Sequence, residues 1–400
     1  MESEEVAREF VQSAPANVTR ESTEPKIDHS AERMSATQRA TPAWIGRGHI
    51  PGLDGLRAVA VLMVVMTHCV QTVGFPDWPL IKQIGLRGAI GVDVFFAISG
   101  FLITTLLVRE LERDGEIGLK RFYLRRFLRI MPAYIGLMVA VAVCQRFEYF
   151  QMQSRDWIGA LTYTTNFLFH PSWELGHSWS LSIEEHFYLL WPFVLYVGGS
   201  VLGWRVGIAC VISCWLIRCG IAFGLLSKIF PAGSELANVT YCAQMAESWT
   251  FTRMDTITMG SLLALACRTS NGRAWLDRLT EPEMLWIYLI TVCVSIALSQ
   301  SGKYMLCVAY TLNGTCIALL MWGAIQSKGV VRRVLSNRLL KVIGLGSYSI
   351  YLWQQLFIHP RHAGWIHEFP QNIVFAMGAA FLSYWLIERP MNRLKDRVAS

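Results

Sequence analysis

Ten long runs of apolar residues follow the first 43 residues of the chain. They lie at about 58–73, 89–108, 130–146, 183–201, 205–226, 254–268, 284–299, 305–326, 342–358 and 372–388. A helix needs about 20 apolar residues to cross a bilayer, so the shorter runs must be tilted or completed by their flanks. Barrel strands would alternate apolar and polar positions, whereas Val59–Val65 and Ile208–Ile212 are continuously apolar. The pattern predicts an all-α polytopic membrane protein, with about ten transmembrane helices around a polar cavity.

The first 43 residues belong to a different compositional class. They are rich in Glu, Ser, Thr and Ala, with eight acidic and five basic side chains. Such a segment cannot bury enough apolar surface to fold, and it lacks the apolar core of a cleavable signal peptide. We expect residues 1–43 to be a disordered tail and residues 44–400 to form one membrane domain.

Composition agrees with this class. Of the 400 residues, 53% are hydrophobic and 16% are charged, against about 25% charged in soluble domains. These values exclude a disordered, collagen-like or coiled-coil chain. The ten cysteines show no paired spacing and nine fall within or beside apolar runs, so neither a disulfide framework nor a metal site is expected.

The distribution of Lys and Arg sets the expected orientation. With the N-terminal tail inside, the inner connections hold 27 of these residues and the outer connections hold 7. Both termini are therefore expected in the cytoplasm. The net charge of +7 is explained by loops at a membrane surface, and no nucleic-acid partner is expected.

The first apolar run carries the main candidate for acid–base chemistry. Arg57 and His68 are eleven residues apart, which places them on one helix face about 16 Å apart along the axis. A histidine at membrane depth is costly unless it lines a polar cavity or finds a partner. Imidazole is also suited to taking a proton from an alcohol near neutral pH. An interhelical hydrogen bond is the alternative.

Two carboxylates at helix starts are further candidates. Asp93 shares a helix face with Gly100, although solvation alone could explain an acid at that position. Ser182 and Glu185 fit a capping box, which explains Glu185 structurally. Glu184 has no such explanation and starts its helix close to the bilayer.

Two arginine motifs indicate binding functions. Arg126 and Arg129 are three residues apart on one face at the predicted cytoplasmic surface. Their guanidinium groups suit bidentate phosphate binding, but equally suit anionic lipid headgroups. Arg253 and Asp255 form an acid–base pair at the start of the sixth run, where a structural salt bridge is the alternative.

Together these residues resemble a known family. Four motifs occur in order: Arg57-x10-His68, Asp93-Val-Phe-Phe-Ala-Ile-Ser-Gly-Phe, Arg126-x-x-Arg129 and Ser180-Leu-x-x-Glu184. From about Ile50 to Arg393 the chain is similar to the family-3 integral-membrane acyltransferases of bacteria, which O-acylate glycans, Nod factors or macrolides. One position departs from the family. Gln354 stands where a histidine is common, and glutamine cannot titrate.

The resemblance implies an inner-membrane enzyme with no permanently bound cofactor. Its donor would be cytosolic acyl-CoA, commonly acetyl-CoA, and its acceptor a hydroxyl of a lipopolysaccharide, exopolysaccharide or other cell-surface or secreted glycan or glycolipid. By motif position, His68 would be the essential histidine, and Arg57, its paired arginine, would belong to the donor-binding residues. Arg126 and Arg129 would hold the donor phosphates, and Glu184 would belong to the active site. Some members carry an appended extracellular domain, and none is expected here because the sequence ends at Ser400.

We expect direct acyl transfer, with His68 taking the acceptor proton and Glu184 or Asp93 fixing its tautomer. The residues expected to bind the acceptor are His177, Trp179, Arg253 and Asp255. Two alternatives stay open. One is an acyl-enzyme on Ser99 or Ser180, and the other is a transporter or a proton or anion channel without covalent chemistry.

Overall fold

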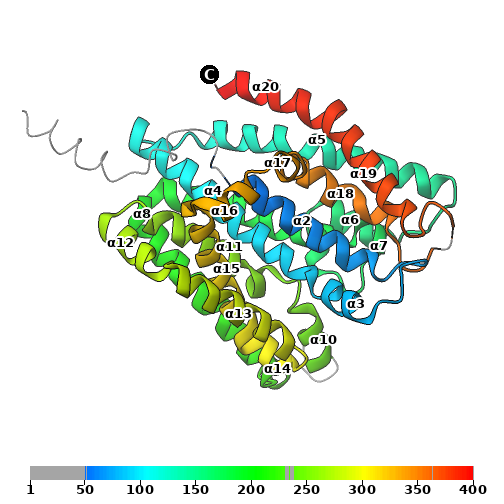
Figure 1. Ribbon diagram of the computed structural model, residues 1–400, viewed down its shortest axis with the longest axis horizontal. Coiled ribbons are helices and arrows are strands. Elements are labelled where there is room, and N and C mark those ends of the chain that lie inside the picture. Colours follow the sequence, from blue (N-terminus) through cyan, green and yellow to red (C-terminus); the bar gives the residue numbers. More distant parts are fainter. Residues whose placement is uncertain (1–49, 51, 230–233, 235–237, 363, 400) are drawn as a thin grey trace, which may run out of the picture. The chain divides into compact units, whose positions relative to one another are not determined.

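The computed structural model describes residues 50, 52–229, 234, 238–362 and 364–399, and every regular element in that part of the chain is helical (Figure 1). The predicted tail, 1–43, lies outside the described residues. In chain order the elements are α2 (Leu53–Cys69), α3 (Pro79–Leu86), η2 (Gly88–Ile90), α4 (Gly91–Asp114), α5 (Leu119–Arg146), α6 (Ser154–Leu161), η3 (Thr165–Phe167), α7 (Trp173–Gly176), α8 (Ser178–Ala222), α9 (Leu226–Ile229), α10 (Val239–Met245), α11 (Thr250–Ala266), α12 (Ser270–Leu279), α13 (Pro282–Leu298), α14 (Gly302–Tyr304), η5 (Met305–Ala309), α15 (Tyr310–Gln326), α16 (Gly329–Leu335), α17 (Arg338–Leu345), α18 (Ser347–Phe357), α19 (Gln371–Ser383), η6 (Tyr384–Glu388) and α20 (Arg389–Ala399). The all-helical prediction is confirmed.

Several of these segments can cross a membrane. Four are long and apolar enough by themselves, namely Pro79–Asp114, Leu119–Arg146, Trp173–Ala222 and Gly302–Gln326, and the bent pair α12 and α13 makes a fifth. Other expected runs fall on shorter helices: α2 and α11 have 17 residues each and α18 has 11. The membrane character predicted from the sequence is therefore confirmed, whereas the number of about ten crossings stays a prediction.

α8 reverses direction near its middle. Gly199 has φ 55° and ψ −154°, a backbone conformation outside the helical range that suits glycine. A Cβ atom on Gly203 would lie 2.7 Å from the Leu195 side chain and 3.9 Å from that of Trp191. Residues 191 and 203 of a straight helix would be about 18 Å apart. α8 is therefore a hairpin of two helical arms, as expected for separate apolar runs at 183–201 and 205–226.

The start of α8 corrects one sequence interpretation. The helix begins at Ser178, so Ser182 lies inside it, and the Ser182 hydroxyl donates a hydrogen bond to the Ser178 carbonyl at 2.9 Å. The predicted capping box of Ser182 and Glu185 is wrong. Its pattern fits a helix start, but here the helix already includes the preceding turn.

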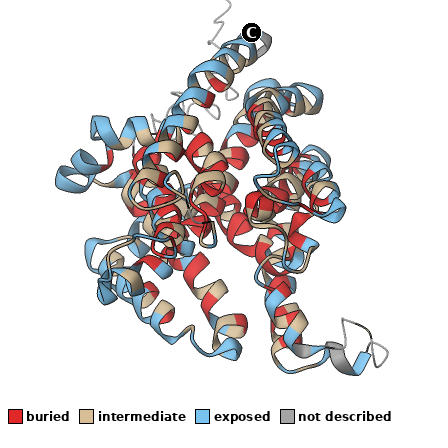
Figure 2. Ribbon diagram, turned by 90° about the vertical axis from the view of Figure 1, so that its right-hand side faces the viewer, coloured by how far each residue is buried: buried red, intermediate tan, exposed pale blue. Residues whose placement is uncertain are grey.

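Buried positions gather on the helix faces that turn toward one another, and exposed positions follow the outer faces (Figure 2). Many exposed side chains are large and apolar. On α13 alone they include Trp286, Ile287, Ile290 and Val294. Soluble proteins rarely expose apolar surface of this extent, so the outer faces suit contact with lipid.

α4 and α11 touch through their backbones. A Cβ atom added to Gly100 would overlap the carbonyl oxygen of Ile257, and one added to Gly260 would overlap the carbonyl oxygen of Ala97. The two glycines therefore permit an approach that a larger residue would prevent. This crossing fixes the start of α4 against the start of α11, where several of the predicted site residues lie.

Candidate active site

The three predicted donor-binding arginines line one cavity. Arg57 of α2 and Arg126 and Arg129 of α5 border a space of about 90 Å³, the arginine cavity. Among its described lining residues, Glu184 is the one carboxylate opposite the three guanidinium groups. An excess of positive charge in a partly enclosed space favours an anionic ligand.

Contacts within the arginine cavity hold its polar groups in place. The guanidinium carbon of Arg126 lies 3.6 Å from the centre of the Tyr188 ring. Within the described chain, the buried Nε of Arg126 has no hydrogen-bond partner. Ser99 donates a hydrogen bond to Oε1 of Glu184 at 2.8 Å. A carboxylate therefore lies beside Ser99, which the sequence spacing did not indicate.

His68 lines a second space of about 290 Å³, the histidine cavity. Its Nδ1 lies 3.3 Å from Oε1 of Gln354, and its Nε2 lies 3.4 Å from Nε2 of Gln355. Oε1 of Gln355 accepts hydrogen bonds from the backbone N–H of His177 at 3.1 Å and from its Nδ1 at 2.9 Å. The backbone donor fixes the orientation of the Gln355 amide, because only an oxygen can accept from it.

This network selects one tautomer of His68. The Gln355 amide nitrogen donates to Nε2 of His68, which must therefore carry a lone pair. The proton of the neutral ring then resides on Nδ1 and is donated to Oε1 of Gln354. A neutral imidazole with the lone pair on Nε2 is the form that a general base requires, and an acceptor hydroxyl reaches this lone pair by displacing the Gln355 amide.

The predicted acidic partners of His68 have other contacts. Glu184 accepts from Ser99, and Asp93 forms an ion pair with Arg253 at 2.7 Å. The position next to Nδ1 that a carboxylate was expected to fill is taken by Gln354. The expected contact of His68 with Glu184 or Asp93 is thus replaced by an amide contact, because α18 packs against α2 and brings Gln354 to the ring.

The two cavities share a wall. Val92 and Tyr351 line both the arginine cavity and the histidine cavity. On its other side the histidine cavity adjoins a groove of about 620 Å³, the Arg253 groove, through the common lining residues Ala89, Pro171 and Trp179. A ligand in the arginine cavity and a ligand in the histidine cavity would therefore approach each other at Val92 and Tyr351.

The predicted acceptor-binding residues separate into two groups. His177 and Trp179 line the histidine cavity, and Arg253 lines the groove beside it. Asp255 is fully buried and is not among the described residues that line these spaces. Its carboxylate pairs with Arg218 at 2.6 Å.

Arg253 and Asp255 do not pair with each other. Arg253 pairs with Asp93 on α4, and Asp255 pairs with Arg218 on α8. The predicted salt bridge between them is therefore wrong. Residues two apart on a helix point about 200° apart, so the two side chains meet different neighbours.

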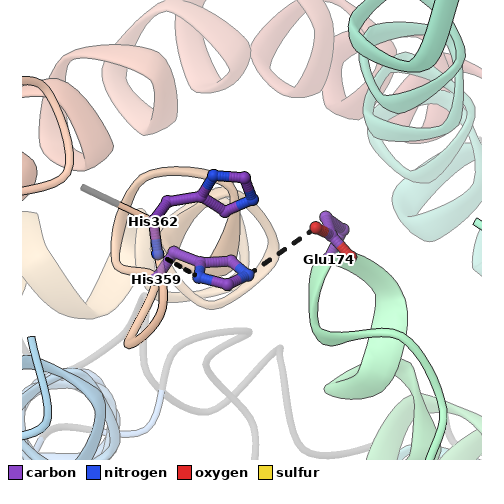
Figure 3. Close-up of side chains that lie close together, drawn as sticks. All are labelled: Glu174, His359 and His362. Atoms are coloured by element: carbon purple, nitrogen blue, oxygen red, sulfur yellow. Dashed lines mark hydrogen bonds and ion pairs between the residues drawn. The ribbon is translucent and has the colours of Figure 1, made fainter. Parts of the chain in front are cut away.

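His359, His362 and Glu174 form a cluster of side chains of the kind that can bind a metal ion (Figure 3). Their ligand atoms lie within 4.8 Å of one another, and Nε2 of His359 is 3.7 Å from Oε1 of Glu174. Nδ1 of His359 accepts hydrogen bonds from the backbone N–H groups of Arg361 and His362 at 3.0 Å. The proton of the neutral ring must then reside on Nε2, where a metal would need a lone pair. This geometry favours a contact between His359 and Glu174 over a metal ion.

Acidification is expected to destabilise the turn that contains His359. Burial, together with neighbouring His362, His367 and Arg361, lowers the pKa of His359 to about 4, against about 6.5 in an unfolded chain. Neutral His359 therefore contributes fully to the stability of the fold above pH 6.5. This contribution is lost as the pH falls toward 4, and the free energy of unfolding is lower by about 2 kcal/mol near pH 4.5. In His359→Asn a side-chain oxygen can still accept the backbone hydrogen bonds, but nothing titrates. Thermal unfolding in detergent should show a smaller drop in Tm between pH 7 and 4.5 for this variant. Equal drops would contradict the assignment.

The chain belongs to the acyltransferase family whose model, described as an acyltransferase domain, matches residues 50–389. This assignment disfavours the transporter or channel alternative.

Curated relatives point to O-acetyl transfer. The chain is 30% identical over 345 residues to "Peptidoglycan O-acetyltransferase OatA" of Listeria monocytogenes, covering 77% of this chain and 49% of that protein. It is 32% identical over 332 residues to "Putative peptidoglycan O-acetyltransferase YrhL" of Bacillus subtilis, covering 76% and 48%. The chain thus spans about half the length of these relatives. No solved structure matches.

Proposed function

We propose that the protein is a multi-pass O-acetyltransferase of a bacterial inner membrane. It moves an acetyl group from acetyl-CoA in the cytoplasm to a hydroxyl of a cell-surface or secreted glycan or glycolipid. The single observation that carries this proposal is the wall shared by the arginine cavity and the histidine cavity. One cavity suits an anionic donor, the other offers a base to a hydroxyl, and the two meet at a common boundary.

The donor enters through the arginine cavity. Arg57, Arg126 and Arg129 present guanidinium groups that suit the phosphates of acetyl-CoA. The excess of Lys and Arg in alternate connections assigns this end of the helices, and both termini, to the cytoplasm. About ten crossings then follow when the two arms of α8 count separately and the short helices are completed by their flanks.

The acceptor enters from the opposite side. His177 and Trp179 line the histidine cavity, and the Arg253 groove continues from it with polar and aromatic side chains. An indole face and charged hydrogen-bonding groups suit a sugar, because a sugar has both apolar faces and hydroxyl edges. The relatives named for peptidoglycan O-acetylation make a peptidoglycan-type glycan the first acceptor to examine.

His68 acts as the base in direct transfer. Nε2 takes the proton of the acceptor hydroxyl as the oxygen attacks the thioester carbonyl carbon. Gln354 holds Nδ1–H and thereby keeps the ring orientation that a carboxylate maintains in a catalytic triad. A neutral amide stabilises the imidazolium less than a carboxylate would, so the proton is readily passed on to the departing CoA thiolate.

The test is acceptor-dependent thioester consumption. Purified protein is mixed with [acetyl-¹⁴C]CoA and glycan strands of peptidoglycan from which alkali has removed ester-linked acetyl groups. We expect release of free CoA together with alkali-labile label on the glycan. CoA release that is the same with and without any glycan, or label that never reaches a sugar, would reject the proposal.

Arg126→Ala is expected to weaken donor binding. Removing one charge-assisted contact to phosphate should raise the KM for acetyl-CoA by about 10- to 100-fold while the KM for the glycan stays the same. Arg121→Ala is the matched control, because Arg121 is an exposed arginine of the same helix that does not line the cavity. A donor KM in Arg126→Ala equal to that of the control would contradict the phosphate-binding assignment.

A further inference from the structure

The wall between the two cavities contains one polar side chain. Of the described residues, Val92 and Tyr351 line both the arginine cavity and the histidine cavity, and Val92 is apolar. The inference rests on the proposed function: with a donor on one side and an acceptor on the other, the new ester bond must form at this wall. The Tyr351 hydroxyl is then a polar group of the wall at which the reacting carbonyl must lie.

The Tyr351 hydroxyl belongs to a small network whose protons can be rearranged. It lies 2.6 Å from Oγ of Ser180 and can donate to the carbonyl oxygen of His177 at 3.0 Å. Oγ of Ser180 can donate to the same carbonyl oxygen at 3.2 Å. When one hydroxyl donates to the carbonyl, the other donates to its neighbouring hydroxyl. With Ser180 on the carbonyl, the proton of Tyr351 points to Oγ of Ser180, which already donates a hydrogen bond of its own, so this proton can turn to another oxygen without leaving the carbonyl unpaired.

We propose that Tyr351 is a catalytic residue that stabilises the oxyanion of the tetrahedral intermediate. The acceptor oxygen bonds to the carbonyl carbon while its proton passes to Nε2 of His68, and the carbonyl electron pair moves onto oxygen. The Tyr351 hydroxyl donates to this oxyanion, and Ser180 takes over the hydrogen bond to the His177 carbonyl. The C=O bond then re-forms, the C–S bond breaks, and the CoA thiolate takes the proton from His68. Tyr351 keeps its own proton throughout.

A structural role has a different signature. The hydrogen bond from Tyr351 to the His177 carbonyl joins α18 to the start of α8. If this were the whole role of Tyr351, its loss would destabilise the fold without a specific effect on the reaction. Stabilisation of an oxyanion acts on the transition state and leaves ground-state binding unchanged. It therefore lowers kcat with little change in either KM. It also lowers the slow hydrolysis of acetyl-CoA by water, which passes through an oxyanion at the same carbonyl.

The experiment compares Tyr351→Phe with Tyr134→Phe in the full chain. Tyr134 is a buried tyrosine of α5 whose hydroxyl also donates to a backbone carbonyl, that of Ala160 at 2.9 Å, but it lines neither the arginine cavity nor the histidine cavity. For Tyr351→Phe we expect kcat to fall about 10²- to 10³-fold, with both KM values within twofold of the wild type. Acceptor-independent hydrolysis of acetyl-CoA should fall by a similar factor. Tyr134→Phe should stay within a few-fold of the wild type in both assays.

Three results would overturn the proposal. The first is a Tyr351→Phe enzyme with unchanged kcat, and the second is an equal loss in Tyr134→Phe. The third is a loss that appears only as a raised KM together with a lowered Tm, which is the structural signature. A wild type that hydrolyses acetyl-CoA in a Tyr351-dependent way but labels no glycan would instead contradict the proposed function alone.

Discussion

Replacing His68 with alanine is expected to abolish transfer of the acetyl group, with a loss of at least about 10³-fold in kcat. The variant removes the imidazole whose Nε2 carries the lone pair of the proposed base, the tautomer that the contacts with Gln354 and Gln355 select. Binding of acetyl-CoA should be unchanged, because the arginine cavity does not include His68. The measurement is release of label from [acetyl-¹⁴C]CoA onto de-acetylated glycan, beside a donor-binding assay.

A second histidine provides the matched control. His186 lies on α8, is part-buried, and has its Nδ1 2.7 Å from Oγ1 of Thr250. It lines neither the arginine cavity nor the histidine cavity. His186→Ala should keep most of the activity, whereas His68→Ala should elute as the same monodisperse species and be inactive. A folded His68→Ala protein with activity near that of the wild type would remove His68 from the mechanism.

The second large effect is expected from Gly100→Ala. The added methyl group would overlap the backbone carbonyl of Ile257, and a backbone atom cannot rotate away as a side chain can. α4 and α11 must then separate, at a cost of at least about 3 kcal/mol. We expect a large fall in the yield of monodisperse protein on size exclusion and a lowered Tm in detergent.

Gly378→Ala is the control for this substitution. Gly378 lies within α19 and a Cβ atom built there meets no other residue within 4 Å. Alanine also has the higher helix propensity, by about 1 kcal/mol. Gly378→Ala should therefore leave the yield unchanged or improved. If Gly100→Ala behaves in the same way, the close crossing of α4 and α11 is not present in the folded protein.

Much of the helical architecture follows from the sequence. The apolar runs at 130–146 and 305–326 coincide with parts of α5 and of the η5–α15 segment, because continuous hydrophobicity and helical hydrogen bonding leave few other solutions in lipid. The family resemblance implies that Arg57, Arg126 and Arg129 bind the donor, and the structure brings them to one cavity. Helix boundaries are less accurate, since α5 begins at Leu119, eleven residues before the predicted run at 130–146.

Side-chain partners were harder to predict. Gln354 is 286 residues from His68, and Asp93 is 160 residues from Arg253. Sequence periodicity indicates which face of a helix is polar but not which helix will lie against it. The contact between Ser99 and Glu184 had no signal in the spacing for the same reason, although it places a carboxylate beside one of the serines considered for an acyl-enzyme.

The boundary formed by Val92 and Tyr351 has a consequence for the cell. A bacterial plasma membrane sustains an electrical potential, and each elementary charge that crosses 100 mV dissipates about 2.3 kcal/mol. A continuous aqueous pore through the enzyme would leak protons at that cost. In the proposed function, the two side chains between the cavities let an acetyl group cross as a covalent fragment while the protein stays an electrical insulator.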